Sequence, residues 1–151
     1  MKILTILICF TIASIGYTQE LHWTNINDIA DSMKVKEKPI LVKLETSWCG
    51  YCKKMDKDVF PNKKVAKEMN ANYYYVKMDA EGKEEIIFND SIYKFVMYSG
   101  GRGIHQLAKK LGSVNGQIKY PTIVILDKNY QVTKLLDGYL PKTDFYYWLK
   151  S

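Results

Sequence analysis

Two cysteines, Cys49 and Cys52, stand three residues apart where an apolar strand pattern changes into a helical one. The preceding stretch, Ile40 to Glu45, is apolar enough for the central strand of a sheet. From Cys49 onward, Cys52, Met55 and Val59 recur at helical intervals. A buried strand that leads directly into a helix places both cysteines at one edge of a sheet, and this restricts the chain to a small set of folds.

The rest of the sequence continues to alternate between strand and helix patterns. In chain order we expect a helix from Asn27 to about Lys36, the strand Ile40–Glu45, helical pieces from Cys49 to Pro61 and from Lys63 to Met69, the strand Tyr73–Asp79, a hairpin of Ile86–Phe88 and Ile92–Val96, a helix Ile104–Leu111, the strands Thr122–Leu126 and Tyr130–Leu136, and a helix starting at Thr143 or Asp144. This order predicts an α/β domain with a central mixed sheet, helices on both faces and an inserted hairpin and helix.

The N-terminus has the pattern of a signal peptide. Lys2 precedes an apolar run from Ile3 to Ile15 that is shorter than the roughly 20 residues needed to span a bilayer. We therefore expect a signal peptide over residues 1–18, a single domain over 19–151, and no stable membrane insertion after cleavage. The protein would then be periplasmic or secreted, and an uncleaved membrane anchor remains the alternative.

Composition narrows the class of protein further. The sequence is 47% apolar and 13% aromatic, which supplies a sizeable core and argues against a disordered chain. The formal net charge is +6, but the lysines are spread along the chain in the manner of solvated helix faces. Since no clustered basic and aromatic stripe is present, we expect no nucleic-acid partner.

The cysteine pair has three possible roles: a metal clip, a structural staple or a redox couple. Removal of Cys9 with the signal peptide leaves Cys49 and Cys52. A tetrahedral zinc site needs three or four protein ligands, and the chain offers only His22 and His105 besides this pair, which disfavours the metal clip. We therefore expect no metal. A disulfide between residues this close in sequence would restrict the unfolded chain little, so the staple is also disfavoured.

A redox couple has a direct physical rationale. A cysteine at the start of a helix faces unpaired backbone N–H groups and the positive end of the helix dipole, and both favour thiolate. Cys49 is therefore the expected exposed nucleophile. Cys52, one turn further along the helix, is within reach to close a disulfide.

The stretch Trp48-Cys49-Gly50-Tyr51-Cys52, directly after a strand, resembles the active site of the thioredoxin superfamily. Tyr120-Pro121-Thr122 resembles the cis-proline loop that faces the cysteines in that family. The resemblance implies the thioredoxin fold, with the inserted hairpin and helix preceding the cis-proline strand. It also implies an activity: thiol–disulfide exchange through a mixed disulfide formed at Cys49 and resolved by Cys52, with no cofactor.

The same resemblance suggests supporting roles for the neighbours of the cysteines. Trp48 would form an apolar wall, and Gly50 would let a partner backbone approach. The backbone of Tyr120, beside Pro121, would pair with the partner chain. Tyr51 replaces the proline of thioredoxin itself, and the resulting Gly-Tyr dipeptide resembles that of some bacterial disulfide isomerases, which leaves the direction of electron flow open.

A second departure lies on the strand before the cysteines. Thioredoxin has a buried acid six residues before its first cysteine, whereas this chain has Lys43, with Glu45 on the same strand face. One interpretation is that Lys43 snorkels or pairs with Glu45. The other is that a buried ammonium near Cys52 favours its thiolate, so that Lys43 and Glu45 tune the couple.

The third departure is the long segment 80–117, which is typical of a lid or partner surface. Its aromatic and basic residues Tyr93, Phe95, Tyr98 and Arg102 either form a recognition patch or pack the hairpin onto the domain. Similar insertions suggest the exported thioredoxin-like proteins grouped with the C-terminal domain of the bacterial electron-transfer reductase.

These observations predict an exported thiol:disulfide oxidoreductase that reduces or exchanges disulfides in proteins. Its partners would be protein thiols and disulfides, with a membrane or periplasmic electron donor. Two alternatives remain: a disulfide oxidase or isomerase, and a non-catalytic binding or chaperone module that retains the fold.

Overall fold

A computed structural model describes residues 20–98 and 100–151, so the predicted signal peptide lies outside the described residues. Its elements, in chain order, are the 3-10 helix η1 (Ile26–Asp28), α1 (Ile29–Val35), β1 (Ile40–Glu45), α2 (Gly50–Asp58), α3 (Lys63–Asn72), β2 (Tyr74–Asp79), β3 (Ile86–Phe88), β4 (Ser91–Tyr93), β5 (Phe95–Met97), β6 (Gly103–His105), α4 (Gln106–Gly112), β7 (Thr122–Leu126), β8 (Val132–Asp137) and α5 (Lys142–Lys150). Within the described ranges, no helix is long and apolar enough to cross a membrane.

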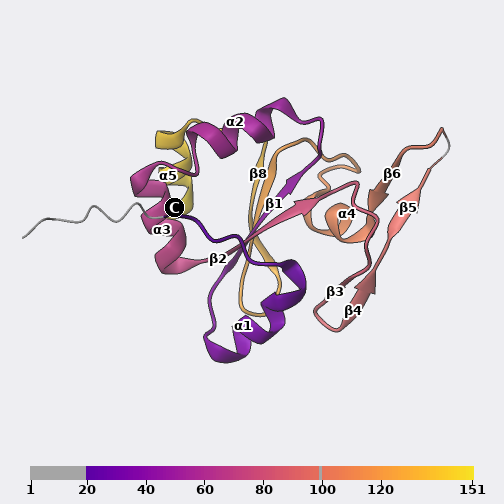
Figure 1. Cartoon of the computed structure of the whole chain (residues 1–151), viewed down its shortest axis with the longest axis horizontal. Coiled ribbons are helices and arrows are strands. Elements are labelled where there is room, and N and C mark those ends of the chain that lie inside the picture. Colours follow the sequence, from indigo (N-terminus) through magenta and orange to yellow (C-terminus); the bar gives the residue numbers. More distant parts are fainter. Residues whose placement is uncertain (1–19, 99) are drawn as a thin grey trace, which may run out of the picture.

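The main sheet has the strand order β2-β1-β7-β8 (Figure 1). β1 pairs with β2 in parallel, Ile40 opposite Tyr74, and the crossover between them carries α2 and α3. β7 is antiparallel to both β1 and β8. The sheet is therefore mixed, as predicted, and β1 is a central strand with partners on both edges.

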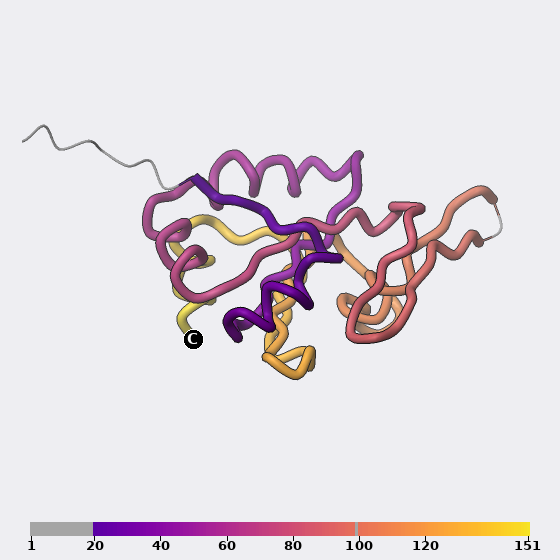
Figure 2. The backbone as a smooth tube through the Cα atoms, turned by 60° about the horizontal axis from the view of Figure 1, so that its bottom comes forward, coloured from indigo at the N-terminus to yellow at the C-terminus, as the bar shows by residue number. Residues whose placement is uncertain are grey.

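Helices cover both faces of this sheet (Figures 1 and 2). On one face, Val42 and Leu44 of β1 are buried in a cluster with residues of α1 and α4. On the other, Leu41 is buried with residues of α2, α3 and α5. Each fully buried aliphatic side chain contributes roughly 1.5–3 kcal/mol. The two clusters hold the helices against the sheet, and the prediction of helices on both faces is confirmed.

The inserted segment forms two hairpins where one was expected. β3 and β4 pair about Asn89 and Asp90, whose positive φ angles fit the predicted turn. The expected second strand Ile92–Val96 is wrong, because the backbone changes partner at Lys94. The carbonyl of Lys94 accepts a hydrogen bond from the Gln106 N–H at 2.9 Å, and from there β5 pairs with β6.

The boundaries of several other elements shift by a few residues. The expected helix Ile104–Leu111 begins later, at Gln106, because the ring of His105 accepts the Leu107 N–H and so caps α4. The strand expected from Tyr130 starts at Val132, since Tyr130 has a φ of 60° in the preceding turn. The order of the main elements is otherwise as predicted.

The aromatic cluster under α5 provides a test of the fold. Phe145 is fully buried and lies edge-on to Phe60, with ring centroids 5.6 Å apart. We expect Phe145→Ala to lower the free energy of unfolding by about 3–5 kcal/mol, because it leaves a cavity in this cluster. Urea denaturation measures the change. The matched control on the same helix is Tyr147→Ala, at a residue 66% exposed, which should change stability by no more than about 0.5 kcal/mol. Equal losses in the two variants would contradict the assigned packing.

Candidate active site

Cys49 and Cys52 form a disulfide at the amino end of α2. Cys49 is the residue that caps the helix, and the backbone N–H of Cys52 donates to its Sγ at 3.0 Å. When the couple is reduced, this N–H and the positive end of the helix dipole both favour a thiolate at Cys49. The predicted position of the pair, between β1 and the helix, is confirmed.

Both sulfur-bearing residues are buried in the disulfide form. Cys49 is 4% exposed and Cys52 1%, so the expectation of an exposed Cys49 is wrong for this state. The cause is the tight turn between strand and helix, in which the Cys49 N–H donates to the Thr46 carbonyl at 3.1 Å. This turn directs the Cys49 side chain toward the first turn of α2. Gly50, in contrast, is exposed and has open space around it.

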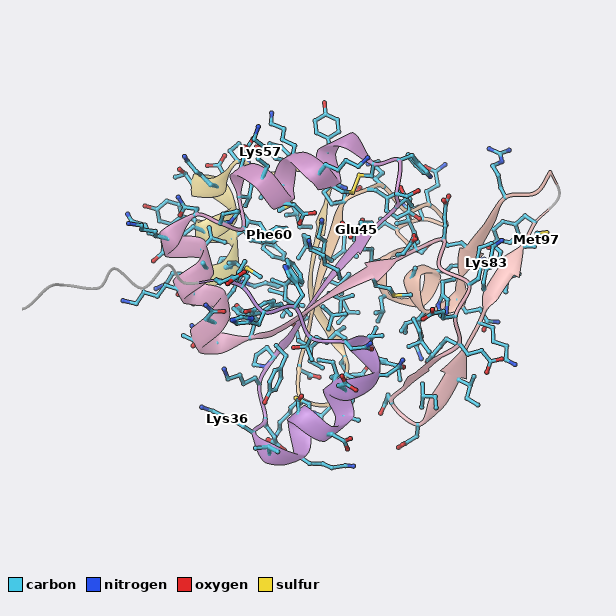
Figure 3. The ribbon with its side chains drawn as sticks, viewed as in Figure 1. Lys36, Glu45, Lys57, Phe60, Lys83 and Met97 are labelled. Carbon is cyan, nitrogen blue, oxygen red and sulfur yellow. A yellow bond between two sulfur atoms is a disulfide. The ribbon has the colours of Figure 1, made fainter. Side chains whose placement is uncertain are left out.

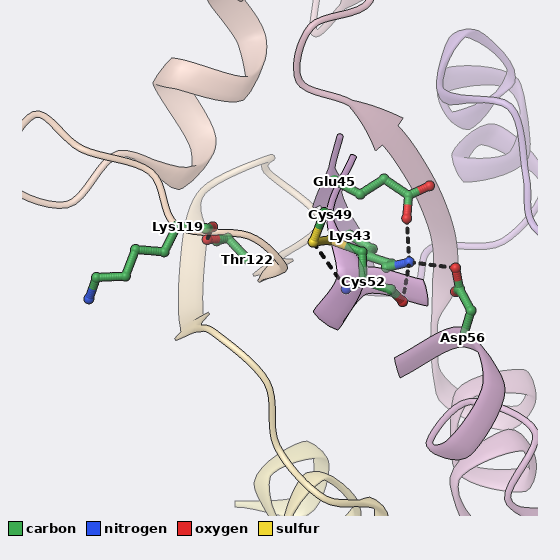
Figure 4. The surroundings of a disulfide bond; sticks show 7 residues. All are labelled: Lys43, Glu45, Cys49, Cys52, Asp56, Lys119 and Thr122. Atoms are coloured by element: carbon green, nitrogen blue, oxygen red, sulfur yellow. Dashed lines mark hydrogen bonds and ion pairs between the residues drawn. A yellow bond between two sulfur atoms is a disulfide. The ribbon is translucent and has the colours of Figure 1, made fainter. Parts of the chain in front are cut away.

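The Tyr120–Pro121 peptide bond is cis, as predicted. The segment from Lys119 to Thr122 that contains it lies near the disulfide (Figure 4). The ring of Tyr120 contacts Trp48 edge-on, with centroids 5.8 Å apart. Burial, reinforced by the negative charges of Glu81 and Asp79, raises the pKa of Tyr120 to about 12. The phenol therefore stays protonated up to about pH 12.

Exposed aromatic rings surround the disulfide. Trp48 is 65% exposed, and its indole Nε1 donates to Glu81 at 3.0 Å. Tyr51 is 63% exposed and lies 6.0 Å from the ring of Tyr139. The ammonium of Lys54 lies 4.9 Å from the same Tyr139 ring. The sequence analysis identified Trp48 and Tyr51 but missed Glu81 and Tyr139, which reach the site from distant parts of the chain.

Lys43 is fully buried beneath α2 (Figure 4). Its ammonium donates to Glu45, to Asp56 Oδ2 at 2.8 Å and to the carbonyl of Cys52 at 3.4 Å. An ammonium has three donor hydrogens, so these contacts satisfy all of them. The predicted pairing of Lys43 with Glu45 is confirmed, and the charge is also held against the backbone of Cys52.

Asp56 is the member of this network that the sequence analysis missed. It follows Cys52 by four residues on α2, a spacing that places both on one helix face and would have identified it. Its Oδ1 lies 3.0 Å from the ammonium of Lys77, an ion pair without hydrogen-bond geometry. Asp56 therefore connects α2 both to β1 and to the edge strand β2.

A cleft of about 190 Å³ opens beside Cys52. Its lining includes Glu45, Asp56 and Asp79, together with Thr46, whose buried hydroxyl has no hydrogen-bond partner in the part of the chain that the structure describes. The carboxylates and hydroxyls of this lining give Cys52 a polar environment on this side. Among residues 20–98 and 100–151, no group of three or more His, Cys, Asp or Glu side chains is arranged to hold a metal ion.

Comparison with known proteins identifies the family. The family model described as a thioredoxin-like domain matches residues 26–151. The chain therefore belongs to the thioredoxin-like domain family. A curated relative, an uncharacterised protein of Caenorhabditis elegans, is 35% identical over 71 residues, which are 46% of this chain and 9% of that protein. The match thus spans a small part of the longer relative.

Solved structures show the same fold at low sequence identity. The thioredoxin from Thermus thermophilus has a TM-score of 0.60 at 16% identity, covering 86% of this chain and 85% of that one. The DsbH oxidoreductase has a TM-score of 0.59 at 17% identity, covering 86% and 82%. The disulphide isomerase of Xylella fastidiosa has a TM-score of 0.54 at 17% identity, covering 80% and 82%. Each is similar to this chain in fold.

The raised pKa of Tyr120 predicts a pH dependence of stability. A folded-state pKa of about 12, above the ordinary value of about 10, means that folding favours the protonated phenol. This contribution is complete below about pH 10 and is lost as pH rises toward 12. In urea denaturation at a series of alkaline pH values, wild-type stability should fall more steeply in this window than that of Tyr120→Phe, which keeps the ring but cannot ionise. Parallel curves would contradict the burial of this hydroxyl.

Proposed function

We propose that this protein is a thiol:disulfide oxidoreductase that reduces or exchanges disulfides in exported proteins. The observation that carries the proposal is the Cys49–Cys52 disulfide at the amino end of α2, next to a cis-proline segment, in a thioredoxin-like domain. The fold shared with the DsbH oxidoreductase and with a disulphide isomerase supports the same class of chemistry. Export is inferred from the apolar run after Lys2, within the predicted signal peptide at residues 1–18.

The proposed reaction begins with the reduced protein. The Cys49 thiolate attacks one sulfur of a partner disulfide, the partner's S–S bond breaks, and its other sulfur leaves as a thiolate that takes up a proton. The Cys52 thiol loses its proton, and the resulting thiolate attacks the Cys49 sulfur of the mixed disulfide. This step releases the second partner thiol and forms the Cys49–Cys52 disulfide. Two electrons have moved to the partner, and the two sulfurs have carried them without a cofactor.

The surroundings of the disulfide suit a polypeptide substrate. A side chain at Gly50 would meet no other atom, and the rings of Trp48 and Tyr51 in the same motif are exposed. Such rings supply contact area at a low cost in side-chain entropy. The backbone of Tyr120, beside Pro121, would pair with the bound chain. These contacts would hold a partner disulfide next to Cys49, which would make the exchange selective for chains that they accommodate.

The reduction potential tests the direction of electron flow. For a reductase, equilibration of the purified protein with glutathione should give a potential of about −270 mV, the value typical of thioredoxin. Such a protein must be recharged by an electron donor, which we place in the membrane or periplasm. A value of about −120 mV would instead indicate an oxidase. Failure to form a reversible disulfide would leave the non-catalytic binding module as the remaining function.

Lys43 provides a second test, which concerns the resolving cysteine. We propose that its ammonium, held against the Cys52 carbonyl, favours the Cys52 thiolate in the reduced protein. Lys43→Met should make Cys52 ionise at a higher pH, as followed by thiolate absorbance in a Cys49→Ser background. The variant should also lose about 1–3 kcal/mol of stability, because Glu45 and Asp56 lose a buried partner.

The matched control for this experiment is Lys34→Met. Lys34 pairs with Asp31 at 2.8 Å, but both side chains are largely exposed, at 76% and 82%. Its loss should leave the urea midpoint of unfolding and the thiol titration unchanged, because a fully exposed pair is screened by solvent. If Lys43→Met lowers stability without moving the Cys52 titration, Lys43 is structural and its redox role is wrong.

A further inference from the structure

The hairpin formed by β5 and β6 extends away from the main sheet (Figures 1 and 2). Figure 3 places Met97 near its tip, well away from Glu45 beside the disulfide. Three consecutive apolar residues are exposed on this hairpin: Val96 by 37%, Met97 by 64% and Tyr98 by 46%. Because side chains alternate along a strand, Val96 and Tyr98 lie on one face of the hairpin and Met97 on the other, so both faces carry exposed apolar groups.

A groove of about 370 Å³ lies between this hairpin and α4. We call it the hairpin groove, and its lining residues are Val96, Tyr98, Ile104, Gln106, Lys109 and Lys110. Val96 is opposite Ile104 in the β5–β6 register, so their side chains share one face of the hairpin, and Tyr98 follows on that face two residues later. The groove therefore combines an apolar strand face with the polar and basic side chains of a helix.

The outer edge of β5 is open. Hydrogen bonds from the Gln106 N–H to the Lys94 carbonyl and from the Tyr98 N–H to the Arg102 carbonyl fix which residues face β6. By the alternation of an antiparallel ladder, Phe95 and Met97 direct their N–H and C=O groups away from β6. Among the described residues, β5 pairs with β6 alone. An extended chain can therefore add to this edge as a third strand.

The charges around the groove favour an acidic occupant. The ammonium of Lys110 donates to the Tyr93 hydroxyl at 2.6 Å, and that of Lys109 lies 6.0 Å from the Tyr98 ring. Neither lysine has a carboxylate partner within the described ranges, and the residues that line the groove include no acid. Both cations are thus held at the rim by aromatic groups and are available to a carboxylate from outside.

We propose that the hairpin groove is a docking site for an extended, acidic segment of a protein partner. The segment adds to the free edge of β5, and its alternate side chains face the groove. Apolar side chains contact Val96 and Ile104, while carboxylates pair with Lys109 and Lys110. This docking site is separate from the disulfide, and binding of the partner segment to the groove does not depend on the redox chemistry proposed above.

An anionic membrane is the competing occupant, since the same face is apolar and basic. The open edge argues against it, because backbone N–H and C=O groups that enter lipid without partners cost several kcal/mol each. An extended polypeptide satisfies these groups and a lipid does not. The strand edge therefore favours a protein segment.

Binding of a defined peptide tests the proposal. The probe is a short fluorescein-labelled peptide designed for an extended conformation. One face of this peptide carries Leu and Glu in alternation, and the other face carries Ser. The control probe has Lys in place of each Glu. Titration of the oxidised protein, followed by fluorescence anisotropy, should show saturable binding of the Glu peptide, weakened by added salt, and at least about tenfold weaker binding of the Lys peptide. Absence of saturable binding, or equal binding of the two peptides, would overturn the proposal.

Variants locate the binding on the molecule. Lys109→Ser/Lys110→Ser should weaken binding of the Glu peptide about tenfold, whereas the matched pair Lys128→Ser/Lys150→Ser, outside the groove, should leave it within about twofold. Equal losses would show nonspecific attraction and contradict the site. The Cys49→Ser/Cys52→Ser variant should bind the peptide like the wild type, which separates this result from failure of the proposed oxidoreductase.

Two further measurements address other occupants of the groove. The fraction of protein that sediments with phosphatidylglycerol vesicles should be the same for the wild type and for Lys109→Ser/Lys110→Ser. If vesicle binding is lost in the Lys109→Ser/Lys110→Ser variant while the peptide fails to bind, the groove is a membrane site and the proposal is wrong. Sedimentation velocity that shows a dimer abolished by the same substitutions would likewise assign the groove to a second copy of this chain.

Discussion

The position of β1 determines the geometry of the site. This strand has a parallel neighbour on one edge, an antiparallel neighbour on the other, and helices over both faces. Residues 40–44 are consequently buried, and the carboxyl end of the strand has little freedom to move. A tight turn then places Cys49 at the start of α2, within hydrogen-bond distance of the helix backbone. The environment that favours a thiolate thus follows from a packed strand and a short connection.

One charged residue lies inside this packed strand. A lysine buried without partners would cost several kcal/mol, so the position of Lys43 requires acceptors on the elements that cover it. Glu45 comes from the same strand, and Asp56 and the Cys52 carbonyl come from α2. The acceptors that compensate the buried charge of Lys43 therefore attach α2 to the sheet. The same contacts place a cation and a carboxylate close to the backbone of Cys52, so the residues that stabilise the fold here are the ones proposed to tune the cysteine pair.

The features that could be predicted from the sequence are those that depend on residues close together in the chain. The strand Ile40–Glu45, the helix that begins at the cysteines and the cis bond before Pro121 each follow from neighbouring residues or a recognisable motif. The partner change at Lys94 was not predictable, because it depends on a hydrogen bond to Gln106, which becomes a neighbour only after the second hairpin has formed. Glu81 contacts Trp48 across a separation of 33 residues and carries no sequence signal of that contact.

The inserted segment 80–117 behaves differently from the rest of the chain. The parts before and after the β5–β6 hairpin contribute to the domain: Phe88 and Leu107 are buried in the core, and Glu81 accepts a hydrogen bond from Trp48 beside the disulfide. The β5–β6 hairpin instead leaves apolar side chains and a strand edge exposed. Packing onto the domain, one of the two interpretations of the sequence, accounts for these flanking parts and not for the exposed residues of the β5–β6 hairpin. A strand edge and an apolar face exposed together are an aggregation hazard unless a partner covers them. The chemistry proposed at the end of β1 and the partner contact proposed on the hairpin thus lie on separate surfaces, and the inserted segment reaches both, because Glu81 accepts a hydrogen bond from Trp48.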